Sequence, residues 1–189
     1  MTLLEHQPVL RDGGNRVLTT ERLVLRAPLL TDVTSIATLA NDLRIAAMTT
    51  RIPHPYSQSD AEEFIARATG DGEIVFAITL AGGPLIGMCG IDRRPDESPE
   101  IGYWLGVPHW SNGYATEAAR ALVGHAFDDL AIDALEAGAR IVNPASLRVL
   151  EKCGFAWTGV ILARIRAIGT SVPVDRFKLD RERWVDRAA

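Results

Sequence analysis

A short loop, Ser111-Asn112-Gly113, combines residue types that suit an anion site: little side chain and several backbone N–H donors. Gly113 can adopt the positive φ that other residues avoid. A strand-like run at 100–105 precedes the loop, and a pattern of apolar residues three or four positions apart follows it at once. In this order the free N–H groups at the helix start, and the positive end of its dipole, point into the loop. The order favours a phosphate site, although an isolated Asn-Gly pair is also typical of a plain turn.

A second helix start lies further along the chain, and it carries a hydroxyl group. Asn143 suits the N-cap, Pro144 suits the first helical position, and Gly154 stands just past the end. If the strands before the two helices are neighbours, both helix starts open on the same side of the sheet. A long ligand with a pyrophosphate can then lie against the first start and bring its reactive end near Ser146. The plainer interpretation is that the Ser146 hydroxyl only bonds to the backbone.

Composition and charge favour an ordinary globular chain without a membrane or nucleic-acid partner. Of the 189 residues, 47% are hydrophobic and 23% are charged, and the formal net charge of -4 lacks the basic footprint of a nucleic-acid binder. No apolar stretch is long enough for a bilayer, and the N-terminus does not resemble a signal peptide. Cys89 and Cys153 lie in apolar segments without metal-ligand spacing. We therefore expect reduced cysteines, a cytoplasmic location and no metal.

The elements that must position these residues follow an α+β order in a single domain. We expect an N-terminal arm at 1–18, the domain at 19–181 and a C-terminal tail at 182–189. Expected helices include 31–39, 42–48, one capped by Ser59-Asp60, the central helix after Gly113, and 143–152. Expected strands are 20–26, 74–80, 85–91, 99–105, 134–142 and two more within 155–179.

Two motifs resemble those of the GNAT acetyltransferases: W-S-N-G-Y-A-T-E-A at Trp110–Ala118 and N-P-A-S-L-R-V-L-E-K-C-G-F at Asn143–Phe155. The preceding strand, E-I-G-Y-W-L, also matches, and the likeness runs from about 20 to 179. It is strongest to the branch of ribosomal-protein N-terminal acetyltransferases, the Rim-type branch. The general pattern at the loop is Q/R-x-x-G-x-G/A, where this chain has Trp110 first; the Rim-type branch also tends to carry an aromatic residue there.

The resemblance implies a fold and a donor substrate. The fold is a mixed, mainly antiparallel seven-stranded sheet, splayed after the fourth strand at Leu105, with helices on both faces. The donor is acetyl-coenzyme A, whose pyrophosphate rests on backbone N–H groups of the loop; no metal takes part. The implied contacts with acetyl-coenzyme A are Leu105, Val107, Trp110, Ser111, Asn112, Gly113, Tyr114, Ala115, Thr116, Asn143 and Ser146.

The resemblance also implies a direct attack by a primary amine, for which two residues are catalytic candidates. Ser146 would donate a hydrogen bond to the departing sulfur. An attacking amine must be neutral, yet an α-amine has a pKa of ~8 and a lysine ~10.4, so a carboxylate such as Glu100 would accept the proton directly or through water. A surface acid at a strand end is the plainer interpretation of Glu100. A backbone N–H near Leu105 or Gly106 would bind the oxyanion. On a strand, one face carries Glu100, Gly102 and Trp104, and the other carries Ile101, Tyr103 and Leu105.

The acceptor and the assembly stay open at this level. The acceptor is a protein N-terminus, a free amino acid or polyamine, or an antibiotic, and it should meet the early helices and the loop 54–56. The alternative function is a non-catalytic acyl-coenzyme A sensor, which would need neither Glu100 nor Ser146. By the same likeness we expect a homodimer through the C-terminal strands.

Overall fold

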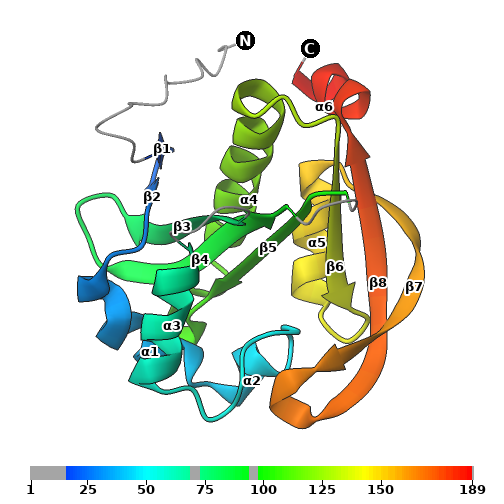
Figure 1. Ribbon diagram of the computed structural model, residues 1–189. Coiled ribbons are helices and arrows are strands. Elements are labelled where there is room, and N and C mark those ends of the chain that lie inside the picture. The colour runs from blue at the N-terminus through cyan, green and yellow to red at the C-terminus, as the bar shows by residue number, and fades with distance from the viewer. Residues whose placement is uncertain (1–15, 69–72, 94–97, 189) are drawn as a thin grey trace.

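The computed structural model describes residues 16–68, 73–93 and 98–188, and the side chains among them up to Trp184 (Figure 1). Most of the expected N-terminal arm, 1–15, lies outside the described residues. Most of the expected C-terminal tail, 182–189, belongs to a helix, α6 (Arg181–Ala188), and its Trp184 ring lies 6.1 Å from that of Phe127.

One sheet of eight strands forms the centre of the molecule, in the order β1-β2-β3-β4-β5-β6-β8-β7. All neighbouring pairs are antiparallel except β5 and β6, which are parallel. The expected number of seven strands was too low, because Val17–Thr19 pairs with β2 instead of belonging to the arm. The strands are β1 (Val17–Thr19), β2 (Leu23–Arg26), β3 (Glu73–Leu80), β4 (Leu85–Asp92), β5 (Glu100–Leu105), β6 (Ala134–Arg140), β7 (Ala156–Ile165) and β8 (Thr170–Asp180).

The sheet opens between β5 and β6. On one side, β5 pairs with β4 along its whole length, from Glu100 to Leu105. On the other side, the register described for β5 and β6 contains only Glu100 opposite Glu136 and Ile101 opposite Ala137. The two strands therefore separate along the second half of β5 (Figure 1), and because the extra strand β1 precedes them, the splay follows the fifth strand in chain order.

Helices cover both faces of the sheet, and each face has its own apolar core. The helices α1 (Val33–Ala40) and α3 (Gln58–Ala68) lie on one face, and α4 (Tyr114–Gly124) and α5 (Pro144–Cys153) on the other (Figure 1). A π-helical segment, 125–129, continues α4. The first core includes Ile36 and Met88, and the second includes Leu122 and Leu150. No helix within the described ranges is long and apolar enough to cross a membrane.

Two helix starts differ in detail from expectation. The short helix α2 (Leu43–Ala46) covers less than 42–48, and Asp42 is its N-cap, whose carboxylate accepts the Arg44 N–H. The helix α3 is capped by Ser57 instead of Ser59: Ser57 Oγ accepts the Asp60 N–H, and an Asp60 oxygen accepts the Ser57 N–H. This reciprocal pair is a capping box, which satisfies two backbone donors at once.

Candidate functional site

The loop before α4 has the backbone geometry of an anion site. Gly113 has φ 82° and ψ -4°, in the left-handed region, and Ser111 has a positive φ of 62°. Gly113 is the N-cap residue of α4, and no side chain caps this helix start. The Asn112 amide instead donates to the Trp110 carbonyl and holds the loop from within. The N–H groups of the first turn, which belong to Tyr114, Ala115 and Thr116, are therefore left for a ligand.

An arginine that the sequence analysis did not consider joins this loop to the first strands. The Arg22 guanidinium donates to Glu117 Oε2 at 2.7 Å and to the Asn112 carbonyl at 3.0 Å, and it lies 4.8 Å from the centre of the Tyr114 ring. Thr20 also donates to Glu117 Oε1, at 2.6 Å. Burial raises the pKa of Glu117, but the hydrogen bonds from Thr20 and Arg22 outweigh it, so the net pKa is lowered. Glu117 stays ionised and holds a cation beside the anion site.

The end of β5 presents backbone groups to the gap between β5 and β6. The Gly106 N–H donates to the Ile86 carbonyl on β4 at 2.8 Å. Because backbone groups alternate in direction along a strand, the N–H and C=O of Leu105 point away from β4, into the gap. The Leu105 carbonyl accepts the Trp110 indole N–H at 2.7 Å. Trp110 thus ties the loop to the strand, and the turn containing Val107 (Val107–His109) lies between them.

The start of α5 brings a serine hydroxyl to the same gap. Asn143 Oδ1 accepts the Ser146 N–H at 3.2 Å, which confirms Asn143 as the N-cap. Ser146 Oγ lies 2.9 Å from Tyr103 Oη, and the Tyr103 hydroxyl also approaches the Ser146 carbonyl at 3.3 Å. Burial raises the pKa of Tyr103, and the hydrogen bond to Ser146 offsets part of that rise. Tyr103 precedes Leu105 by two residues on the same strand face, so Ser146 is held beside the exposed backbone of β5.

Glu100 lies at the closed end of the gap. Its two carboxylate oxygens accept hydrogen bonds from Arg176 at 3.0 and 3.1 Å, and Arg176 also donates to Glu136 at 2.7 Å. Leu105 lies five positions after Glu100 along β5, a distance of about 16 Å. This geometry does not bring Glu100 together with Ser146 and Leu105, and a proton would have to cross from the amine to Glu100 through water.

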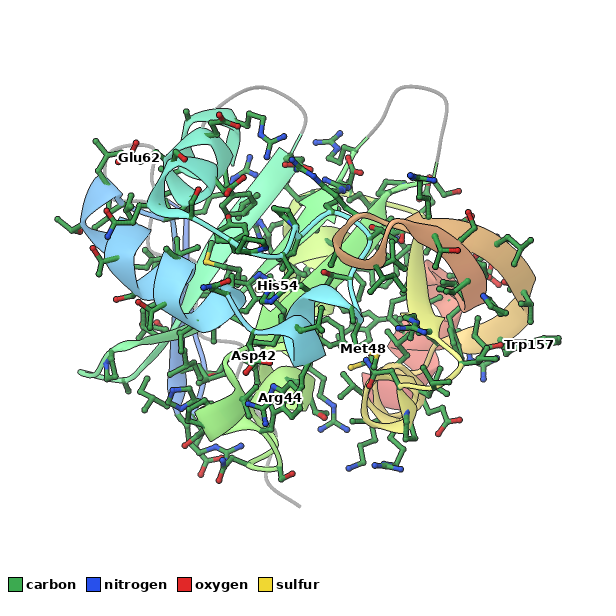
Figure 2. The ribbon with its side chains drawn as sticks, turned by 90° about the horizontal axis from the view of Figure 1, so that it is seen from below. Asp42, Arg44, Met48, His54, Glu62 and Trp157 are labelled. Carbon is green, nitrogen blue, oxygen red and sulfur yellow. The ribbon has the colours of Figure 1, made fainter. Side chains whose placement is uncertain are left out.

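The open end of the gap is covered by α2 and the loop after it. Figure 2 looks at this end from below and shows Asp42, Arg44 and Met48 between the half of the molecule with α1 and α3 and the half with β7 and β8. Arg140, the last residue of β6, donates to the Ala47 carbonyl at 2.7 Å. The segment is therefore anchored across the gap. Among the described residues, no group of three or more His, Cys, Asp or Glu is arranged to hold a metal ion.

A splayed sheet with a helix start on each side of the gap defines a class of transferase, and the comparisons identify the family. The model of the acetyltransferase (GNAT) domain matches residues 22–156. The chain belongs to the GNAT family of N-acetyltransferases. It is 36% identical over 111 residues to the probable N-acetyltransferase YjcK of Bacillus subtilis, covering 57% of this chain and 61% of that protein. The chain spans about half the length of the curated relatives that it matches.

Solved structures show the same fold. An acetyltransferase of the GNAT family from Bacillus anthracis superposes with a TM-score of 0.78 at 22% identity, covering 88% of this chain and 99% of that chain. The spermidine N-acetyltransferase of Vibrio cholerae, solved with coenzyme A and spermine, has a TM-score of 0.76 at 21% identity; the match covers 88% of this chain and 99% of that chain. At these identities the likeness establishes the fold.

Proposed function

We propose that this acetyltransferase moves acetyl from acetyl-coenzyme A to a primary amine by direct attack, without a covalent enzyme intermediate. One observation carries the proposal: the Ser146 hydroxyl is held 2.9 Å from Tyr103, beside the splay-facing backbone of β5. The uncapped start of α4, with Gly113 at positive φ, fits a pyrophosphate. On the motif alone we place the chain in the Rim-type branch.

The chain supplies hydrogen bonds at both atoms that gain negative charge. As the amine nitrogen bonds to the acetyl carbon, the Leu105 N–H stabilises the oxyanion. When the carbon–sulfur bond breaks, the electron pair leaves on sulfur and Ser146 donates to it. A thiol has a pKa of ~8.5, well below that of a buried tyrosine, so full proton transfer from Tyr103 to the thiolate is unfavourable. In this proposal Tyr103 donates to Ser146 Oγ, which leaves the serine proton free to point toward the sulfur.

The proton of the attacking amine leaves toward Glu100 through water in this proposal. Direct transfer is ruled out by the distance along β5, and Arg176 already bonds both carboxylate oxygens. Each oxygen keeps a second lone pair, which suffices for a water molecule. If no water path exists, the amine must arrive neutral and Glu100 only joins β5 to β8.

The test is release of free thiol from acetyl-coenzyme A with a panel of primary amines. We expect amine-dependent release, together with a mass increase of one acetyl group on the amine. Binding of acetyl-coenzyme A without turnover on any amine would support the alternative function, an acyl-coenzyme A sensor. Ser146→Ala separates the two, because it should slow turnover and leave binding unchanged.

A second copy of the chain is the partner that we propose for the outer edge of the sheet. The edge strand β7 exposes Trp157, Val160, Ile161 and Leu162, and Figure 2 shows Trp157 at the outer side of the molecule. An open edge with apolar side chains is a template for strand pairing. Light scattering should give a dimer mass for the wild type and a lower mass for Leu162→Lys; a monomeric wild type at micromolar concentration would refute this arrangement.

A further inference from the structure

A small apolar cavity lies beside β5, on the face opposite Tyr103. Its volume is about 30 Å³, and its lining side chains come from α1, the loop after α2, α3 and β5: Ile36, Ala40, Ile52, Tyr56, Phe64 and Trp104. The polar side-chain atoms of this set are the Tyr56 hydroxyl and the Trp104 indole N–H. Burial raises the pKa of Tyr56 to about 12, so the hydroxyl is neutral at physiological pH. The lining carries no charge.

The position of the cavity relative to the gap is set by the alternation of β5. Tyr103 and Leu105 face α4 and α5, where the helix starts suit the donor. Trp104, which stands between them, faces α1 and α3 and packs against the other core. At the end of the strand, a Cβ on Gly106 would lie 2.6 Å from the Leu39 side chain, so α1 sits directly on β5 there. The cavity therefore lies against Trp104, the residue before Leu105, on the sheet face opposite the helix starts that suit the donor.

A row of strand carboxylates on this face of the sheet is already bonded to arginines. Glu73, Asp92, Glu100 and Glu136 are successive partners across β3, β4, β5 and β6 and form one row. Arg51 pairs with Glu73 and Asp92, and Arg176 pairs with Glu100 and Glu136. A second ammonium group, as in a polyamine, would have to displace one of these guanidinium groups to bind at this row.

We infer that the acceptor is a monoamine with a short aliphatic group on the carbon beside the nitrogen, and that this group enters the cavity. The inference rests on the proposed acetyl transfer to an amine. A water-sized group needs roughly 10–15 Å³ of cavity volume, so the cavity holds two or three such groups, which corresponds to a side chain no larger than that of valine. The N-terminus of a polypeptide and a small α-amino amide both present this chemistry.

The experiment compares kcat/KM for valinamide, glycinamide and spermidine at saturating acetyl-coenzyme A. Valinamide has three more carbons than glycinamide, so their burial should raise kcat/KM by about tenfold or more, and valinamide should also exceed spermidine. A preference for spermidine, or equal values for valinamide and glycinamide, would overturn the inference. If acetyl-coenzyme A binds and none of a wide amine panel is acetylated, the proposed function fails instead. A valine-initiated pentapeptide assayed beside valinamide distinguishes a polypeptide from a small molecule as the source.

Two variants test the cavity itself. Ala40→Val adds two methyl groups inside it and should abolish the preference for valinamide, while glycinamide keeps its rate. Ala37→Val adds the same groups to the same helix at a buried position outside the cavity lining, so it should leave the preference intact. If Ala40→Val fails to fold, Ile52→Ala is the second variant: it enlarges the cavity from the loop and should shift the preference toward leucinamide. An unchanged order of substrates in a folded Ala40→Val or Ile52→Ala protein would refute the assignment.

Discussion

Removal of the hydroxyl pair at the start of α5 should slow acetyl transfer without weakening donor binding. Ser146 Oγ and Tyr103 Oη lie 2.9 Å apart, a normal distance for a neutral hydrogen bond. Such a bond contributes about 0.5–1.5 kcal/mol, which corresponds to a factor of about 2 to 13 in rate. We therefore expect kcat to fall by this factor in Ser146→Ala, and by a similar or smaller factor in Tyr103→Phe.

The double variant gives the decisive measurement. If Tyr103 acts through Ser146, the serine must be present for the tyrosine hydroxyl to matter. The variant with both substitutions should then be no slower than Ser146→Ala alone, because coupled residues are not additive. Steady-state thiol release at saturating substrates gives kcat, and calorimetry with coenzyme A should give the wild-type Kd for all three proteins.

Two outcomes would refute this reasoning at different points. Wild-type turnover in a folded Ser146→Ala protein would show that the serine is only a helix residue. A loss in Ser146→Ala with additive losses in the double variant would keep the serine role, but it would show that the Tyr103 hydroxyl acts independently of Ser146.

Three further predictions concern the loop, the fold and the base. Gly113→Val should raise the Kd for coenzyme A at least tenfold, because φ is 82° at this position. The control Gly82→Val, at φ 67° in a remote turn, should leave the Kd unchanged. Equal Kd values for the two variants in calorimetry would show that the pyrophosphate does not bind at this loop. Burial raises the pKa of Asp32, but hydrogen bonds, chiefly from Arg26, lower it more, so the net pKa is lowered. The ionised Asp32 carboxylate therefore stabilises the folded state above pH ~4, and this contribution is lost as pH falls through the lowered pKa. Asp32→Asn should lose about 1.5–3 kcal/mol in urea unfolding at pH 7, and a loss that stays constant down to pH 3 would contradict this. In Glu100→Gln, the part of the pH profile of kcat/KM that reports titration of an enzyme group should disappear. Glu136→Gln, which breaks the same arginine network, should keep it. Matching profiles for the two variants would show that Glu100 has only a structural role.

The parts of the site that depend on neighbouring residues were predictable from the sequence. The turn at Gly113 follows from a glycine between a strand and a helix, and the cap at Asn143 follows from the residues around it. Local rules were less secure where two candidates competed: Ser57 and Ser59 both suit a cap, and only the pairing with Asp60 selects Ser57.

The contacts that complete the site join residues far apart in the chain, and no local pattern reports them. Tyr103 and Ser146 are 43 residues apart, and Arg22 and Glu117 are 95 apart. The edge strand β1 was missed for the same reason, since three residues have little periodicity and become a strand only through β2. The position of Glu100 also depends on a distant residue, because Arg176 lies on β8.

The separation of β5 from β6 decides what the alternating side chains of β5 can contact. In a closed sheet, successive side chains of a strand point to opposite faces, so they lie in different layers and do not meet. Where β6 turns away, the backbone of β5 is exposed between the layers, and both faces reach it. Tyr103 bonds to Ser146 on one face, Trp104 lines the cavity on the other, and the Leu105 N–H points into the gap between them; in the proposed reaction these are the donor side and the acceptor side. A shift of β5 by one residue against β4 would exchange these faces, so the continuous pairing of β5 with β4 fixes the face on which each side chain lies.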